Sequence, residues 1–228
     1  MGYDKESLDL RVIMLLPINF IAKSTGSNGR NAEIFQLHLS DVCEKYDINT
    51  KARICAFLSQ IGHESAGMSR LQENLNYSSD ALMKLFGRSR ISSEDCARLG
   101  RNSLHPADQK SIANTIYGGD WGKRNLGNLV YGDGWKHRGM GLKQLTGLDN
   151  HTRCGKALGL DLISYPELLL IPEHAAMSAG WFWNANGLNA IADRKDIPML
   201  TKKINGGDFG LAERTKLFNA AMSYDLVI

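Results

Sequence analysis

Two glutamates nine residues apart, Glu64 and Glu73, are the residues of this chain whose type and spacing could do chemistry. Glu64 follows an apolar stripe of helical period, so we expect it at a helix end beside the core, where a carboxyl group keeps its proton more easily. Glu73 lies among Gln72, Asn74 and Asn76, which are typical of a solvated loop where a carboxylate stays ionised. A protonated carboxyl and an ionised one are the acid and the base that glycosidic bond hydrolysis requires.

The alternative interpretation is that a glutamate at a helix end is a solvated charge or the ion-pair partner of a cation. Four motifs in fixed order favour the catalytic interpretation. They are His63-Glu64-Ser65, Glu73-Asn74-Leu75-Asn76-Tyr77-Ser78, Arg138-Gly139-Met140-Gly141-Leu142-Lys143-Gln144-Leu145-Thr146-Gly147 and Ile204-Asn205-Gly206-Gly207. With these motifs the chain resembles glycoside hydrolase family 19, and most of all its bacteriophage endolysin branch. Four ordered matches are far more specific than one.

The resemblance implies an inverting mechanism, in which the acid and the base stand about 6.5–9.5 Å apart to admit a water. Glu64 would protonate the glycosidic oxygen and Glu73 would deprotonate the water. In the plant chitinase branch the second carboxylate comes later in the chain, so Asp80 and Glu94 remain rival bases. Thr146 would hold the water, because a hydroxyl both donates and accepts; the alternative is an ordinary turn threonine.

Six further residues are predicted by the same resemblance to bind substrate. They are His63, Tyr77, Gln144, Asn150, Asn205 and Arg214. His63 could instead only hold the loop backbone, and Asn205 before two glycines could be only a helix C-terminal turn. Three residues depart from the family pattern, namely Met140 for Arg, Lys143 for an apolar residue and His151 for Tyr. These departures fall in the segment expected to face substrate and bear on specificity.

Composition indicates one catalytic domain over residues 1–228, with no separate cell-wall-binding domain. A net charge of +3 suits an anionic polymer, and the short basic runs do not indicate nucleic acid. The four cysteines have no Cys-x-x-Cys pair and are expected to be reduced. The histidines show no ligand spacing, so we expect no metal and no cofactor. The apolar stretch from Val12 to Ala22 is too short to span a bilayer unaided and lacks the features of a signal peptide, so we expect a first core helix, with a transient membrane anchor as the alternative.

Helical periodicity dominates the chain. The pattern predicts helices around residues 35–46, 50–64, 78–85, 106–118, 172–183, 197–206 and 211–222. Only the Gly-rich stretch from Tyr131 to Thr146 suggests strands, as a small β-hairpin. The expected fold is mainly α, of the α+β lysozyme-like kind that the resemblance implies, with two lobes and a central cleft.

The expected function is that of a phage endolysin, a lysozyme that cuts the β-1,4 bonds between N-acetylmuramic acid and N-acetylglucosamine in peptidoglycan. The alternatives are a chitinase on the same scaffold and a catalytically inactive sugar-binding protein. Retention of Glu64, Glu73, Gln144 and Thr146 argues against the inactive protein. We expect a monomer made in the cytoplasm of a bacterial host, acting on the wall in the periplasm, with a separate membrane pore for its export.

Overall fold

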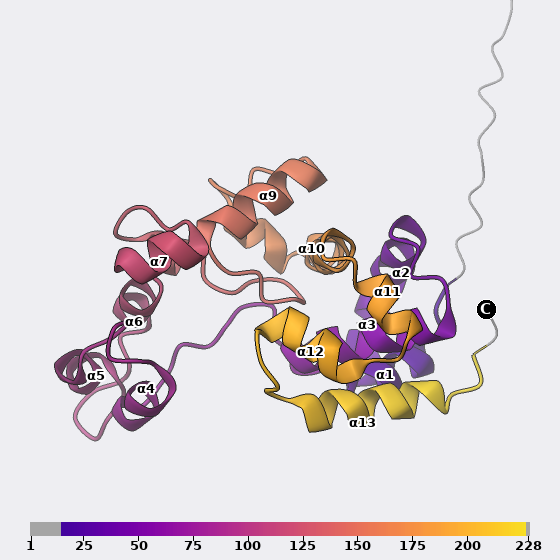
Figure 1. Cartoon of the computed structure of the whole chain (residues 1–228), viewed down its shortest axis with the longest axis horizontal. Coiled ribbons are helices and arrows are strands. Elements are labelled where there is room, and N and C mark those ends of the chain that lie inside the picture. The colour runs from indigo at the N-terminus through magenta and orange to yellow at the C-terminus, as the bar shows by residue number, and fades with distance from the viewer. Residues whose placement is uncertain (1–14, 227–228) are drawn as a thin grey trace, which may run out of the picture.

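The computed structural model describes residues 15–226, and helices dominate that part of the chain (Figure 1). The α-helices are α1 (Ile18–Thr25), α2 (Gly29–Lys45), α3 (Lys51–Glu64), α4 (Ser79–Leu85), α5 (Ser93–Leu99), α6 (Gln109–Ile116), α7 (Gly119–Leu126), α8 (Asp133–Lys136), α9 (Leu148–Leu158), α10 (Pro172–Ala185), α11 (Leu188–Asp193), α12 (Ile197–Asn205) and α13 (Leu211–Met222). A 3-10 helix, η1, spans Pro166–Leu170. The mainly α prediction is confirmed.

Local capping chemistry sets several of these boundaries. The Thr50 hydroxyl accepts from the Arg53 N–H at 3.3 Å and begins α3, and the Ser78 hydroxyl does the same for Ala81 at 3.1 Å before α4. Gly206 ends α12 in the left-handed conformation, at φ 82°. One predicted start was wrong, because α6 begins after the capping Asp108 rather than at Pro106.

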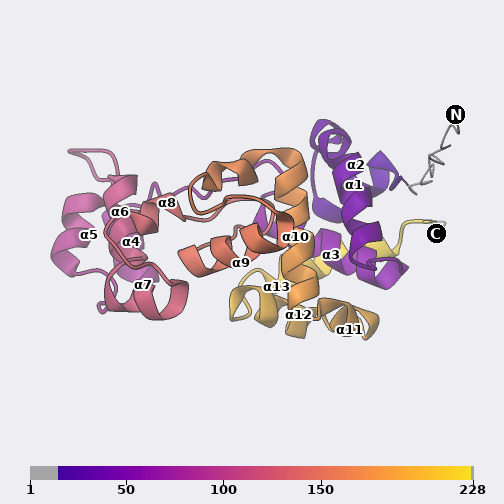
Figure 2. The same ribbon diagram turned by 90° about the horizontal axis from the view of Figure 1, so that it is seen from above.

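The buried apolar side chains form three clusters. The largest joins α1, α2 and α3 to α10, α11, α12 and α13. A second joins α4, α5 and α6, and a third lies between α9, η1 and the Gly-rich segment. Figures 1 and 2 show α4 to α7 together at one end of the molecule and α1 to α3 with α11 to α13 at the other, with α9 and α10 between them. The two-lobed arrangement therefore reflects two separate main cores.

The Gly-rich stretch that predicted a hairpin is more irregular than expected. Its first part forms the short helix α8. Its second part retains one turn, in which Met140 and Leu145 exchange backbone hydrogen bonds of 3.1 and 2.8 Å. Met140 also forms an antiparallel bridge with Gln72. We call residues 139–146 the central segment, because it runs between the two lobes and beside the chain that carries Glu73.

The predicted first helix is shorter than the apolar stretch that suggested it. Pro17 precedes α1, which begins at Ile18, and residues 12–14 lie outside the described part of the chain. Within residues 15–226, no helix is long and apolar enough to cross a bilayer. All four cysteines are free, as predicted, and all four are buried.

Candidate active site

Glu64 is the last residue of α3, and it faces a buried cation. Arg214, from α13, donates through Nη2 to Glu64 Oε1 at 2.5 Å and through Nη1 to Gln60 Oε1 at 2.6 Å. The Arg214 side chain is 1% exposed and that of Glu64 is 14% exposed. The position of Glu64 beside the core was predicted, but the apolar surroundings were not found. Helix periodicity predicted that Glu64 lies at a helix end beside the core. It could not predict its partner Arg214, which is 150 residues later in the chain.

His63 is covered by the loop between α12 and α13. Its Nδ1 lies 2.8 Å from Glu213 Oε2, and its ring centroid lies 5.9 Å from that of Phe209, a side chain that is 78% exposed. Gly210 has φ 75°, and a Cβ there would stand 2.2 Å from His63 Nε2, so the loop requires glycine at this point. Asn205 uses both ends of its amide within the loop, bonding to Phe209 O and to Gly207 N at 2.8 Å each. These contacts fit the alternative interpretation of Asn205, in which it belongs to a helix C-terminal turn.

Glu73 lies in an extended segment, and its side chain is half-buried. Its N–H donates to Gly139 O at 2.9 Å, and the Tyr117 hydroxyl donates to its Oε2 at 2.9 Å. Burial raises the pKa of Glu73, opposed by the Tyr117 hydrogen bond and by the charge of Arg138. Its other oxygen, Oε1, is buried with no hydrogen-bond partner in the described structure. The predicted solvated loop was wrong for Glu73 itself, because Tyr117 and the central segment cover it.

The central segment brings Gln144 close to Glu73, and Thr146 and Asn150 are hydrogen-bonded in sequence behind it. A Cβ on Gly139 would stand 3.1 Å from Glu73 Oε2 and 3.2 Å from Gln144 Oε1, so a side chain there would press on both. The Thr146 hydroxyl donates to Gln144 O at 3.0 Å, and Asn150 donates to Thr146 O at 2.8 Å. The Thr146 oxygen therefore keeps lone pairs that can accept a hydrogen bond from a water.

Lys143 is the residue of the central segment on which the charge of Glu64 acts. It precedes Gln144 in the central segment, and its Nζ lies 4.6 Å from the Phe182 ring centroid. Burial lowers the pKa of Lys143, the charge of Glu64 opposes this, and the charge of Arg214 adds to it. The central segment thus contacts Glu73 at Gly139, and the charge of Glu64 acts on it at Lys143.

The rival bases and Tyr77 lie on the Glu73 side of the molecule. Tyr77 packs edge-on against Phe86 with centroids 5.5 Å apart, and burial together with the charge of Glu73 raises its pKa. Asp80 and Glu94 are exposed in the first turns of α4 and α5, where a carboxylate favours the helix dipole. In the described structure no hydrogen bond joins either of them to the central segment.

Two of the three departures from the family pattern turn out to be core positions. Met140 is 2% exposed and belongs to the third apolar cluster, and His151 is fully buried in α9. The His151 ring centroid lies 5.0 Å from that of His137, and its Nδ1 lies 2.9 Å from Gly147 O. Our expectation that these residues face substrate was wrong for Met140 and His151.

Sequence reasoning missed Tyr117, Gln60 and the electrostatic influence of Glu64 on Lys143. Tyr117 follows α6 and stands 44 residues from Glu73, before two glycines that indicated only a turn. Gln60 lies one turn before Glu64 on α3, and this spacing was the available signal for a shared partner.

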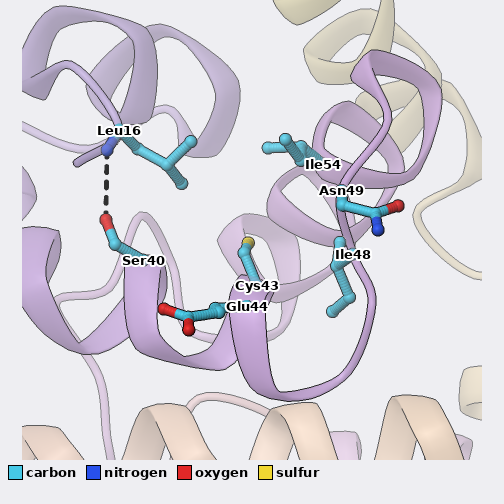
Figure 3. A pocket seen from close by; sticks show the side chains of 7 residues that line it. All are labelled: Leu16, Ser40, Cys43, Glu44, Ile48, Asn49 and Ile54. Carbon is cyan, nitrogen blue, oxygen red and sulfur yellow. Dashed lines mark hydrogen bonds between the residues drawn. The ribbon is translucent and has the colours of Figure 1, made fainter. Parts of the chain in front are cut away.

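A pocket of about 300 Å³ lies in the lobe of α1 to α3, and neither glutamate lines it (Figure 3). Its lining consists of Leu16, Ser40, Cys43, Glu44, Ile48, Asn49 and Ile54. The Ser40 hydroxyl in its wall accepts from the Leu16 N–H at 3.0 Å. None of these residues contributes to the contacts of Glu64 or Glu73 described above, so the candidate active site rests on those contacts and on the central segment.

Comparison with known proteins identifies the family of this site. No family model matches the chain. A curated relative, the "Glycosyl hydrolase family 19 domain-containing protein" of Haemophilus influenzae, is 35% identical over 187 residues, which cover 82% of this chain and 87% of the relative. The chain belongs to glycoside hydrolase family 19. The domain is therefore a glycoside hydrolase domain, as the sequence motifs predicted.

Proposed function

We propose that this family 19 domain is a peptidoglycan-degrading lysozyme of the endolysin type, which serves lysis of a bacterial host. It cuts the β-1,4 bond between N-acetylmuramic acid and N-acetylglucosamine with inversion. The observation that carries the proposal is that Glu73 lies against the central segment, which holds Gln144 and Thr146, while the charge of Glu64 acts on Lys143 of the same segment. The net charge of +3 suits the anionic wall polymer. The enzyme would act in the periplasm after passage through a separate membrane pore.

The proposed reaction uses one proton donor and one proton acceptor. Glu64 gives a proton to the glycosidic oxygen as the bond to the anomeric carbon breaks. Glu73 takes a proton from a water that attacks the opposite face of the ring, and the Thr146 hydroxyl orients that water. Burial of Glu73 raises its pKa, which makes it a stronger base near neutral pH.

The reverse assignment, with Glu73 as acid and Glu64 as base, is favoured by the same burial of Glu73 and by the contact of Glu64 with Arg214. A leaving-group experiment separates the two. A β-glycosyl fluoride needs little help from an acid, so Glu64→Gln should lose about 10²–10⁴-fold on glycan strands and much less on the fluoride. Azide should restore turnover to Glu73→Ala by replacing the activated water. If the fluoride rescued Glu73→Gln and azide rescued Glu64→Ala, the roles would be reversed.

Substrate and stereochemistry test the proposal as a whole. We expect the protein to clear a suspension of purified peptidoglycan and to act more weakly on a chitin hexamer. Proton NMR early in the reaction should show the α-anomer at the new reducing end. Cleavage of chitin without clearing of peptidoglycan would make the protein a chitinase, and binding without product from either polymer would make it a sugar-binding protein. An initial β-anomer would exclude inversion.

A further inference from the structure

A second pocket, of about 340 Å³, lies in the lobe that contains α6 and α7. Its lining consists of Asn114, Gly118, Gly119, Asp120, Lys123, Asn128, Leu129, Val130 and Tyr131. None of these residues is a candidate catalytic or sugar-binding residue of the site around the central segment. The pocket does, however, begin directly after Tyr117, the residue that bonds to Glu73, so it belongs to the Glu73 side of the enzyme.

The wall of this pocket holds a buried hydrogen-bond donor that nothing satisfies. Asn114, on α6, is 6% exposed. Its Oδ1 accepts from the Trp135 N–H at 2.8 Å, which fixes the orientation of the amide, while its Nδ2 has no partner among the described residues. A buried donor without an acceptor is unfavourable. A ligand that offers an oxygen to Nδ2 would remove that penalty.

Two opposite charges line the same pocket. Asp120 and Lys123 are exposed residues of α7, and the described structure contains no ion pair for either. The N-cap of α7 is Gly118, which has no side chain to satisfy the first backbone N–H groups of the helix. The pocket therefore offers several donors with one cation, suited to a carboxylate, and one anion, suited to an ammonium group.

The rim of the pocket is apolar. Leu129, Val130 and Tyr131 follow one another in the loop after α7, with exposed fractions of 66%, 68% and 83%. Consecutive exposed apolar side chains beside a polar floor are typical of a site whose ligand has an aliphatic portion and a polar end.

We propose that this pocket binds the zwitterionic end of a peptidoglycan stem peptide, an ammonium and a carboxylate on one carbon at the end of an aliphatic side chain. The carboxylate would accept from Asn114 Nδ2 and lie near Lys123, and the ammonium would lie near Asp120. Chitin has no such group, so the pocket would favour peptidoglycan over chitin. The inference rests on the proposed function for the identity of the polymer.

The test uses the full chain and a defined probe, the tripeptide L-alanyl-γ-D-glutamyl-meso-diaminopimelate, with binding followed by NMR titration. Asn114→Asp keeps the acceptor for Trp135 and replaces only the unpartnered donor, and Lys123→Gln removes the cation. Each should weaken binding about tenfold or more, as expected for loss of one hydrogen bond to a charged group. Arg124→Gln removes a charge from the adjacent position, which does not line the pocket, and is the matched control. It should bind like the wild type.

The tripeptide that ends in L-lysine tests the ligand chemistry, because it keeps the ammonium and lacks the terminal carboxylate. It should bind wild type about tenfold more weakly. The inference is overturned if the diaminopimelate tripeptide does not bind, if both tripeptides bind equally, or if Arg124→Gln weakens binding as much as Lys123→Gln. Turnover of glycan strands freed of peptide reports on the proposed function alone, and Lys123→Gln should leave it unchanged. Absence of that turnover in the wild type would count against the proposed function, whatever the tripeptide does.

Discussion

Glu64 stands at the end of a fourteen-residue helix and faces a buried guanidinium, whereas Glu73 stands in an extended segment and faces a phenol and the protein backbone. The first carboxylate is held by a charge of opposite sign. The second is hydrogen-bonded by neutral groups in a desolvated place, where the charge of Arg138 acts on it without an ion pair, and its Oε1 has no hydrogen-bond partner in the described structure. The two regions should therefore fail in different ways. Loss of a single partner should disturb the Glu64 region, and a change of pH should disturb the Glu73 region.

The largest effect is expected at Arg214. Replacing it with Gln removes the cation from a buried pair and leaves Glu64 as an uncompensated charge, so the free energy of unfolding should fall by about 3–5 kcal/mol. Urea unfolding at pH 7 measures this change. Arg53→Gln is the control, because Arg53 forms an exposed pair with Asp193 at 2.7 Å, and its loss should lower the free energy of unfolding by about 1 kcal/mol or less. Equal effects of the two variants would show that burial of the Glu64 pair has no energetic consequence.

The same contrast explains what could be predicted from the sequence. Periodicity and capping signals gave α3, α12 and α13 and the helix-end position of Glu64, because these are local properties of the chain. The surroundings of both carboxylates depend on partners that are distant in sequence, such as Tyr117 for Glu73. Asn74 and Asn76 are exposed, as their polar side chains predicted. Their exposure does not extend to Glu73, which lies between the central segment and Tyr117. The family motifs identified Glu73 without revealing its environment.

Thr146 tests whether the Glu73 region needs a hydroxyl for chemistry. Thr146→Ser keeps the donor and the acceptor and should retain most of the kcat. Thr146→Val keeps the shape and loses both, so transition-state stabilisation should fall by roughly 2–4 kcal/mol, as for loss of one preorganised polar group. Steady-state kinetics on peptidoglycan, with thermal unfolding of each variant, separates chemistry from packing. Equal kcat and equal stability in the two variants would reduce Thr146 to a turn residue.

His151 tests the pH sensitivity of the structure beneath the central segment. Burial lowers the pKa of His151 to about 4, against an ordinary value of 6.5, and the neighbouring His137 also has a lowered pKa through burial. The unfolded state binds the proton first, so stability is present above pH 6.5 and is lost as the pH falls toward 4. Between pH 7.5 and 5 the loss from His151 should be about 2 kcal/mol.

His151→Phe should remove that part of the acid sensitivity, at the loss of the hydrogen bond to Gly147 O. Unfolding measured at pH 7.5 and at pH 5 gives the comparison. The free energy of unfolding of the variant should be lower than that of the wild type at pH 7.5, and it should decrease less between pH 7.5 and pH 5. A variant that loses as much stability as the wild type would assign the acid sensitivity to other groups.

The smallest effect, and the most direct test of the contrast, is the stability of Glu73→Gln. Burial raises the pKa of Glu73 in the folded protein above its value in the unfolded chain, so the folded state binds the extra proton. Stability from this group is therefore full in acid and is lost as the pH rises through the raised pKa. Gln is neutral at every pH and can still accept from the Tyr117 hydroxyl.

The variant should be inactive, with a higher Tm than the wild type at pH 7 and no such gain at pH 3.5. Taking the difference between the two proteins at each pH cancels the titration of His151 and His137. A lower Tm for the variant at pH 7 would mean that the folded protein stabilises the ionised form of Glu73. Both regions would then stabilise an ionised glutamate, and the contrast between them would be lost.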